Sequence, residues 1–388
     1  MTEQDKTAVR VLGYADSGIC SGAESLFAAV LAGIAADPAF EVDFAAPSSN
    51  RELVALLEDA TGKPPAADVP AQPLKLAALH LYDPRRRRAA AAALAGLEPD
   101  LVLLNLPSVE YGSTPLALRA LQGIPIVGLV HITGSMEALD FQMGGTRARL
   151  ARRVLRRLDR ACVLSEGAAR SFSEQWGSRD AHPAVIRMPR PEPVEVEQVA
   201  ARRDLGLPAT GPLVGIGGRL TMKQKGHDTL IEASERIATL RPEVGFVVAG
   251  AGRDRVGLEK MVDDRGLSES WHFLGQVSPI DGFLGAIDAI AIPSRFEGLP
   301  LIALEALSAG VPGIASSVDG LSDIWPPGWL IEPDDSAALA AGLLAILEAR
   351  PDEIAGPLES GRELMERRVA DDPSADVRGV LSEVAADA

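Results

Sequence analysis

The feature that most constrains the fold of this chain is a repeated alternation of short apolar runs with amphipathic or alanine-rich stretches. The apolar runs are rich in Val, Ile and Leu and end in Gly, Pro, Asn or Ser, which is typical of strands that lead into loops. Their continuous apolar character indicates strands covered on both faces, in parallel sheets joined by right-handed crossovers. The pattern predicts an α/β protein with strands near residues 9–13, 41–45, 101–105, 124–130, 161–165, 184–188, 213–217, 245–249, 271–274, 289–293, 313–316 and 329–332.

A proline-rich segment divides this alternation into two halves. Three prolines lie within the six residues 188–193, and proline continues neither a helix nor a central strand. We therefore expect two Rossmann-like, doubly wound domains, residues 1–190 and 191–369, that face each other across a ligand-binding cleft. The last ~25 residues are polar and compatible with a helix, and they predict no further strand.

Charge and composition exclude several classes of function. The formal net charge is −16, so the chain repels nucleic acid. Cys20 and Cys162 form no CxxC pair, and no zinc or redox motif is visible. The longest early apolar run is too short to span a bilayer and lacks the arrangement of a signal peptide, so we expect a cytoplasmic protein. The sequence carries no indication of oligomeric state.

Residues 293–310 combine the end of a strand, a loop and an apolar helix that contains one carboxylate. Pro300 suits the first turn of a helix, where its missing N–H is no loss. Glu305 would lie in the second turn among Leu, Ile and Ala, and such a carboxylate needs partners or stays protonated. Two adjacent ribose hydroxyls would satisfy both of its oxygens. Glu297 lies in the preceding loop, at the carboxyl end of a strand, where open α/β sheets bind ligands.

Two structural explanations compete with ligand binding at these glutamates. Ser294 and Glu297 have the spacing of a capping box, but a helix that began there would contain Pro300 and be broken by it. Glu305 can instead pair with a neighbouring arginine in a structural salt bridge, and the residues alone do not separate this explanation from a functional one.

A second motif, residues 215–228, runs from a strand into glycines and then into Arg219 and Lys225. Glycines such as Gly218 allow the backbone to approach a ligand closely, and the two cations can neutralise a diphosphate. The alternative is a solvated basic loop. Only six lysines occur in the chain, and the presence of Lys223 and Lys225 in one loop disfavours that alternative.

The first half of the chain contributes two further candidates. A glycine-rich loop, residues 13–24, joins the first strand to the first helix, and Gly22 can turn N–H groups toward phosphate. Its spacing matches neither a dinucleotide fingerprint nor a Walker loop, and a plain tight turn is the alternative. His131 follows an apolar strand and can hydrogen-bond a sugar or transfer a proton, although a lone histidine there is more often structural.

These motifs together resemble a known family, the retaining glycosyltransferases of family 4, also called glycosyl transferases group 1. That family has the two-domain GT-B fold. The resemblance is strong over roughly residues 212–325 and loose over the first domain. It rests on residues that recur in the same order and spacing: Arg219, Lys225-Gly226, Gly250-Ala-Gly252, Phe273-Leu-Gly275, Glu297-x7-Glu305 and Ala309-Gly-Val-Pro312.

The resemblance implies a role for each candidate residue. The first domain would bind the acceptor and the second the donor, and a last helix, about 370–388, would pack back on the first. Arg219 and Lys225 would bind the donor diphosphate and stabilise its developing charge. Glu305 would hold the ribose, and Glu297 would hold the donor sugar. The remaining implied contacts come from Gly22 and Gly218 near the phosphates, Gln276 and Val277 at the nucleobase, Gly298, Leu299, Pro300 and Leu301 at the sugar, and His131 beside it.

The chemistry that the resemblance implies needs no metal and no cofactor apart from the donor. The sequence has no obvious Asp-x-Asp motif, and the two cations would do the work of a metal. The expected reaction transfers a hexosyl-type sugar from a UDP- or GDP-linked donor to a hydroxyl of a small-molecule or glycan acceptor with retention of configuration. Attack inside a tight ion pair requires no nucleophilic residue, and none is named.

An arginine-rich stretch, residues 147–160, allows a different partner. On a helix Leu150, Val154 and Leu158 would share one face, with arginines around the rest. Weak docking to an anionic membrane is one hypothesis. A solvated helix face balanced by the acidic remainder is the other, and the net charge favours it. The composition is typical of a bacterial chain rich in Arg and Ala.

Two other classes of function remain open at this point. One is another enzyme of the same fold, such as a sugar-nucleotide epimerase or a phosphorylase. The other is a non-catalytic subunit that binds a nucleotide sugar. The glutamate pair in its context favours transfer over the first, and the intact candidate residues favour an enzyme over the second.

Overall fold

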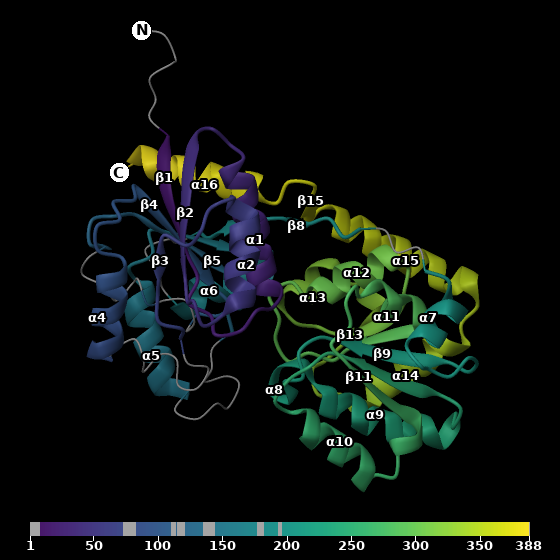
Figure 1. Ribbon diagram of the computed structural model, residues 1–388. Helices are drawn as coiled ribbons and strands as arrows, with labels where there is room; N and C mark the ends of the chain where they lie inside the picture. The colour runs from purple at the N-terminus through teal and green to yellow at the C-terminus, as the bar shows by residue number, and fades with distance from the viewer. Residues whose placement is uncertain are drawn as a thin grey trace. The chain divides into compact units, whose positions relative to one another are not determined.

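The computed structural model describes residues 8–72, 83–109, 114, 121–134, 144–176, 182–192 and 196–387. The chain divides into two compact units (Figure 1). The first unit runs to Pro189 and resumes at Val369, and the second unit comprises Arg190–Arg368. Each unit has its own parallel sheet with helices on both faces.

The sheet of the first unit has the strand order β3-β2-β1-β4-β5-β6-β7, and every paired strand in it is parallel. The order reverses between β1 and β4, as in doubly wound folds. The apolar runs build this sheet because their side chains are buried on both faces; β4 is buried at every position. The strands are β1 Val9–Tyr14, β2 Phe40–Ala46, β3 Ala67–Asp68, β4 Leu101–Leu106, β5 Ile126–Val130, β6 Arg160–Val163 and β7 Ala184–Val185.

Helices cover both faces of this sheet. Helix α1 packs against α2 and against α16 on one face (Figure 1). On the other face, side chains of α4, α5 and α6 join the strands in one apolar core, to which Leu155, Phe172 and Trp176 contribute. The helices of the unit are α1 Gly22–Ala35, α2 Arg51–Thr61, α4 Pro84–Ala93, α5 Gly144–Leu155, α6 Glu166–Trp176 and α16 Ser374–Asp387.

The second unit repeats the doubly wound order with six strands, β11-β10-β9-β12-β13-β14, all parallel. Its order reverses between β9 and β12, which pair directly at the centre of the sheet. The strands are β9 Leu213–Gly217, β10 Gly245–Ala249, β11 Trp271–Gly275, β12 Ala289–Ile292, β13 Gly313–Ser316 and β14 Leu330–Ile331.

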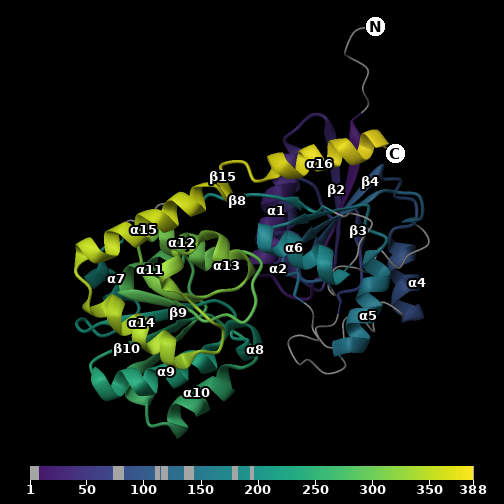
Figure 2. The same cartoon turned by 180° about the vertical axis from the view of Figure 1, so that it is seen from behind.

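Two layers of helices enclose this second sheet. Helix α9 packs with α10 and α14 on one face, and α12 packs with α11 and α15 on the other (Figure 2). The helices are α7 Gln198–Asp204, α8 Met222–Lys225, α9 His227–Leu240, α10 Arg255–Asp264, α11 Asp281–Ala286, α12 Leu301–Ala309, α13 Asp319–Ile324, α14 Ser336–Glu348 and α15 Pro351–Glu366, with short 3-10 turns at Ser268–Ser270 and Pro327–Trp329.

Three details differ from the sequence-based expectations. The prediction that no strand follows in the last ~25 residues is wrong, because β15, Val369–Ala370, pairs with β8, Met188–Pro189, in a small parallel sheet. The expected strand over 184–188 is divided between β7 and β8. The arginine-rich helix α5 ends at Leu155, so Leu158 lies beyond it.

The buried positions of the arginine-rich stretch also differ from the expected stripe. Ala148, Ala151 and Leu155 are buried on α5, whereas Leu150 is only half-buried. The side chain of Val154 lies outside the described part of the structure. Within the described ranges, no helix is both long enough and apolar enough to cross a bilayer.

Candidate functional site

The candidate site of the second unit lies at the carboxyl ends of β9 and β12, the two strands between which the strand order reverses. Ligands bind at such points in open α/β sheets because the loops that leave neighbouring strands diverge there. Two loops leave the sheet here. Residues 218–226 follow β9 and contain the turn α8, and residues 293–300 follow β12 and lead into α12.

Glycines allow these loops to pack closely. A Cβ atom on Gly217 would lie 3.0 Å from Ile302 of α12, so the helix rests directly on the end of β9. Gly250 has a φ of +155°, and a Cβ there would lie 1.8 Å from the carbonyl oxygen of Gly218. A side chain at that position would push the loop after β10 away from the loop after β9. Gly320 approaches the carbonyl oxygen of Gly298 equally closely.

Lys225 and Glu297 form a nearly buried ion pair across the two loops. The Lys225 ammonium lies 2.6 Å from Oε1 of Glu297, and the side chains are 15% and 5% exposed. The Ser294 hydroxyl donates to the same carboxylate oxygen over 2.7 Å. The spacing Ser294-x-x-Glu297 therefore marks a loop contact rather than a helix cap, and α12 begins at Leu301 with Pro300 as its N-cap residue.

Arg219 lies in the same loop after β9 as Lys225, but it differs from Lys225 in exposure and pairing. Its side chain is exposed, and among the described residues none accepts a hydrogen bond from its guanidinium. The nearby Gly218 adopts a φ of +125°, and a Cβ on it would lie 3.5 Å from Cε of Lys225. Of these two cations, Lys225 is paired with a carboxylate, whereas Arg219 can meet an anionic ligand.

Glu305 is a partly buried carboxylate for which the described residues provide no hydrogen bond and no salt bridge. Burial in an apolar helix raises its pKa, and the charge of Asp281 adds to the effect, to give a pKa of about 7. The structural alternative, an ion pair with arginine, therefore finds no support. A ligand that donates hydrogen bonds to this carboxylate would stabilise its ionised form.

The remaining predicted contacts of the second unit lie at the same edge of the sheet. Gly298, Leu299 and Pro300 are buried before α12, and Leu301 is half-buried at its start. Among the described residues no side chain caps α12; the amide of Ala303 donates to the carbonyl oxygen of Pro300, and the amides before it can meet a ligand. Gln276 and Val277 follow β11, the edge strand, where Gln276 is exposed.

Gly22 and His131 belong to the first unit, where they lie at the carboxyl ends of its strands. Gly22 is the first residue of α1, after Ser21. His131 follows β5 and is buried, and its Nε2 lies 2.8 Å from Oδ1 of Asn105. Burial lowers the pKa of His131 to about 3, so the imidazole is neutral. It can exchange hydrogen bonds with a ligand but is not a proton donor as imidazolium.

Asn105 connects His131 to a second buried group that the sequence analysis did not single out. Its Nδ2 lies 3.5 Å from Oε1 of Glu24, and Ser21 donates a hydrogen bond of 2.6 Å to Oε2 of Glu24. Glu24 is fully buried. Because a carboxylate only accepts, this contact turns the amide oxygen of Asn105 toward His131, whose Nε2 then carries the proton.

Matches to known proteins agree with this geometry. A family profile described as "Glycosyl transferases group 1" matches residues 198–355, and one described as "Glycosyl transferase 4-like domain" matches residues 21–189. The chain is 30% identical over 265 residues to the GDP-mannose-dependent monoacylated alpha-(1-6)-phosphatidylinositol monomannoside mannosyltransferase of Corynebacterium glutamicum, which covers 63% of this chain and 68% of that protein. It is also 30% identical over 283 residues to the 2-deoxystreptamine glucosyltransferase of Streptomyces kanamyceticus, covering 68% and 72%. The chain belongs to the group 1 glycosyltransferases.

Solved structures show the same fold. The structure of Anabaena HepE in complex with UDP and glucose superimposes with a TM-score of 0.75 at 20% identity, covering 96% of this chain and 99% of that chain. Sucrose-phosphate synthase from Thermosynechococcus elongatus gives a TM-score of 0.75 at 22% identity, covering 98% and 100%. The fold of this glycosyltransferase is GT-B, with two parallel α/β domains, and the protein is a transferase enzyme.

The glycosyltransferase also holds a residue that the sequence did not reveal as part of the site. Arg295 lies in the loop between β12 and α12, and its guanidinium makes more polar contacts than any side chain assigned in advance. The only signal in the sequence was its position between Ser294 and Glu297. Within the described ranges, no three His, Cys, Asp or Glu side chains gather as a potential metal site.

Proposed function

We propose that this glycosyltransferase transfers a hexosyl-type sugar from a nucleotide-diphosphate sugar to an acceptor hydroxyl with retention of configuration, and that it does so without a metal. In this proposal the second unit binds the donor. Arg219 and Lys225 hold the diphosphate, Glu305 holds the ribose, and Glu297 with the first-turn amides of α12 holds the sugar.

The observation that carries the proposal is the state of Glu305. Its carboxylate is partly buried beside apolar helix residues, has no partner among the described residues, and has a pKa of about 7. Burial without a partner costs free energy that a ligand with two adjacent hydroxyls would recover. A ribose offers that pair of hydroxyls. The position of Glu305 one turn into α12 places it at the edge where the cations lie.

The charge of the loop after β9 supports the assignment of the diphosphate. Among the described residues, the guanidinium of Arg219 has no acceptor and the ammonium of Lys225 is bound by one carboxylate oxygen. A diphosphate can bind both side chains, because charge-assisted hydrogen bonds to phosphate are among the stronger polar contacts. The same two cations can stabilise the leaving diphosphate as its charge develops in the transition state.

The arrangement of Glu297 supports retention without an enzyme nucleophile. A carboxylate that attacks the sugar must be free to approach it. Glu297 is instead 5% exposed and is bound at one oxygen by both Lys225 and Ser294. Its proposed role is to position the sugar while the acceptor attacks from the side on which the diphosphate leaves.

The named proteins support the choice of donor in this proposal. The two relatives named above are a GDP-mannose-dependent mannosyltransferase and a glucosyltransferase, and HepE has been solved with UDP and UDP-glucose. We therefore propose a UDP- or GDP-linked hexose as donor. The acceptor is proposed to be a small molecule or glycan that offers a hydroxyl to the first unit, near His131.

Nucleotide titration tests the donor assignment. We expect one of UDP, GDP, ADP or dTDP to bind the wild-type protein in isothermal titration calorimetry, and the Glu305→Gln variant to bind it about tenfold more weakly, because it loses a charge-assisted hydrogen bond. The corresponding nucleotide sugar should release nucleoside diphosphate faster when an acceptor is added. Equal affinity of the Glu305→Gln variant and the wild type for the same nucleotide would refute the assignment of the ribose.

A further inference from the structure

We propose that Arg295 is a positioning residue that holds the turn containing Lys225 in place when the donor diphosphate draws the lysine away from Glu297. This inference rests on the proposed function of Lys225. It concerns a side chain that is saturated by protein contacts and therefore acts on the ligand only through the lysine.

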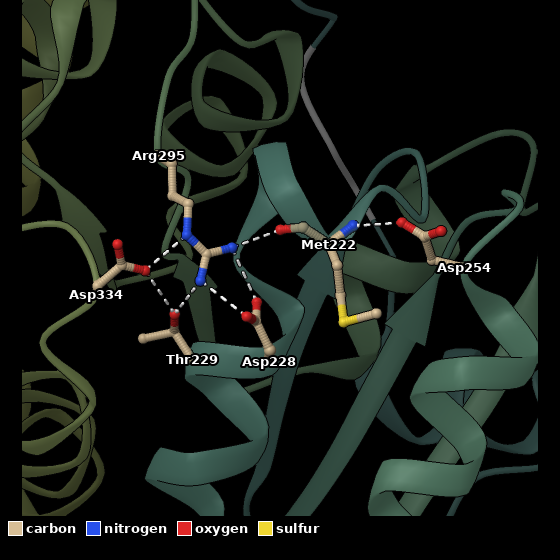
Figure 3. A network of polar contacts seen from close by, with 6 residues as sticks. All are labelled: Met222, Asp228, Thr229, Asp254, Arg295 and Asp334. Carbon is tan, nitrogen blue, oxygen red and sulfur yellow. Dashed lines mark hydrogen bonds and ion pairs between the residues drawn. The ribbon is translucent and has the colours of Figure 1, made fainter. Parts of the chain in front are cut away.

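All five N–H donors of the Arg295 guanidinium have acceptors (Figure 3). Nη1 donates to the carbonyl oxygen of Met222 over 2.6 Å and to Oδ1 of Asp228 over 3.0 Å. Nη2 donates to Oδ2 of Asp228 over 2.8 Å and to the Thr229 hydroxyl over 3.5 Å, and Nε donates to Asp334 over 2.6 Å. No donor remains for a ligand.

These contacts join four segments of the second unit. Arg295 belongs to the loop after β12, Met222 begins the turn α8, Asp228 and Thr229 lie in the first turn of α9, and Asp334 precedes α14. The Arg295 and Asp228 side chains are 23% and 26% exposed, so their two-point pair is partly shielded from water. Asp334 is 58% exposed, and its contact adds less. The pair with Asp228 and the bond to Met222 therefore carry the connection.

The turn itself is held at several backbone atoms. The Arg295 amide donates to the carbonyl oxygen of Gln224 over 2.8 Å, and Asp254 accepts from the amide of Met222 over 2.8 Å. Figure 3 shows Arg295 and Asp254 on opposite sides of Met222. Lys225 adds one more contact, the ion pair of its own side chain with Glu297. Arg295 thus contacts the backbone of both Met222 and Gln224, just before Lys225.

Binding of a ligand affects the Lys225–Glu297 ion pair and the contacts of Arg295 differently. A diphosphate competes with Glu297 for the Lys225 ammonium, so the ion pair weakens in the bound state. The contacts of Arg295 do not involve the ammonium and persist. They keep the backbone of the turn in position, which lowers the entropy lost when the lysine is ordered against the diphosphate.

Only arginine suits this position. Its planar guanidinium reaches the two oxygens of Asp228 and two further acceptors at once, whereas lysine offers a compact charge with three donors. Arg295→Lys keeps the charge and loses the geometry. It therefore removes the restraint on the turn without leaving Asp228 as an unpaired partly buried charge.

Arg202 provides a matched control at the opposite edge of the same sheet. It donates to the carbonyl oxygens of Ala286 and Gly211 and to Asp288, over 2.8, 2.9 and 2.7 Å, and its side chain is 4% exposed. Asp288 also accepts from the amide of Leu213, the first residue of β9. Arg202→Lys thus disturbs a comparable network at the amino ends of the strands, away from the candidate site.

The experiment is a double-mutant cycle read by calorimetric titration with UDP, GDP, ADP and dTDP. In the wild-type background, we expect Arg295→Lys to lower the affinity for the bound nucleotide by about tenfold. In the Lys225→Gln background the same substitution should lower it by less than about twofold, since the two residues act through one contact. Arg202→Lys should lower the melting temperature and leave the affinity unchanged. An equal loss in both Lys225 backgrounds, no loss, or the same loss in Arg202→Lys would overturn the proposal.

Hydrogen exchange of the ligand-free protein separates this inference from the proposed function. We expect the amides of residues 223–226 to exchange about tenfold faster in Arg295→Lys, and to be unchanged in Arg202→Lys, because the first loses a restraint on the turn. If wild-type protein binds none of the four nucleotides, the proposed function fails while this measurement still decides whether Arg295 restrains the turn. Unchanged exchange in Arg295→Lys would reject the restraint whatever the nucleotides do.

Discussion

The two units share one strand order but place different chemistry at the point where the order reverses. In the first unit, buried polar side chains form a chain of contacts from His131 through Asn105 to Glu24. In the second unit, Arg219 and Lys225 bring positive charge to the edge of the sheet. The topology therefore reverses at the corresponding place in both units, and the loop residues there decide which ligand group each can meet.

Each unit also has a buried histidine at that edge, and the two differ in their partners. His131 has Asn105 as a hydrogen-bond partner. His227, at the start of α9, has both ring nitrogens buried without a partner among the described residues. Burial lowers the pKa of His227 to about 4, helped by the charge of Lys225. The buried histidine of the second unit thus lacks a partner among the described residues, whereas that of the first unit has one.

The largest expected effect is the loss of a cation in the second unit. Lys225→Gln should weaken binding of the nucleoside diphosphate by about a hundredfold, because it removes a charge-assisted contact to phosphate. Lys223→Gln, two residues away in the same turn, is the control and should change the affinity by less than about threefold. Calorimetric titration measures both variants. A similar loss in the two would show that overall loop charge, rather than Lys225, binds the ligand.

A variant in the first unit should affect stability rather than nucleotide affinity. Asn105→Ala leaves His131 and Glu24 without their shared partner, and we expect the free energy of unfolding to fall by about 2 kcal/mol. The affinity for nucleoside diphosphate should stay the same. Urea denaturation and titration of the same preparation test both parts. Weaker nucleotide binding at unchanged stability would contradict the proposed division of work between the units.

The unpartnered histidine predicts a stability effect that depends on pH. The folded protein keeps His227 neutral down to about pH 4, whereas the unfolded chain binds a proton below about pH 6.5. The wild type therefore loses stability through this group as the pH falls from 6.5 toward 4. His227→Leu removes the loss, so its stability relative to wild type should rise by ~1.5 kcal/mol between pH 7.5 and pH 5. A difference in melting temperature that does not change with pH would contradict this.

The smallest expected effect concerns the protonation of Glu305. Its pKa of about 7 means that the empty site holds a large share of protonated carboxyl at neutral pH. Ligand hydroxyls prefer the ionised form, so nucleotide affinity should fall by about fivefold as the pH is lowered from 8 to 5.5. In Glu305→Gln this dependence should disappear. An identical pH profile in the variant, measured by titration, would place the ionising group elsewhere.

Much of the fold could be predicted because its signals are local. The strands β9, β10 and β13 begin and end where the apolar runs do, since each run is buried on both faces. The two-residue strands β8 and β15 could not be predicted in the same way. They exist only because residues 181 positions apart in the chain come together.

The candidate site shows the same limit. Lys225 and Glu297 were each selected from the sequence, but not their ion pair, which depends on the direct pairing of β9 with β12. Arg295 gave no signal beyond its position, because a saturated guanidinium is recognisable only from its acceptors. Glu24 looked like an ordinary first-turn residue, and its burial against Asn105 appeared only with the sheet.

The sequence alone determined that the chain forms two parallel α/β domains and which loops carry glycines, cations and carboxylates. These properties follow from hydrophobic periodicity and backbone chemistry within short stretches of chain. Only the tertiary structure decided that Lys225 pairs with Glu297, that Glu305 has no partner among the described residues and that Arg295 contacts the turn that contains Lys225. Charge pairing and desolvation depend on distances between segments that folding alone brings together.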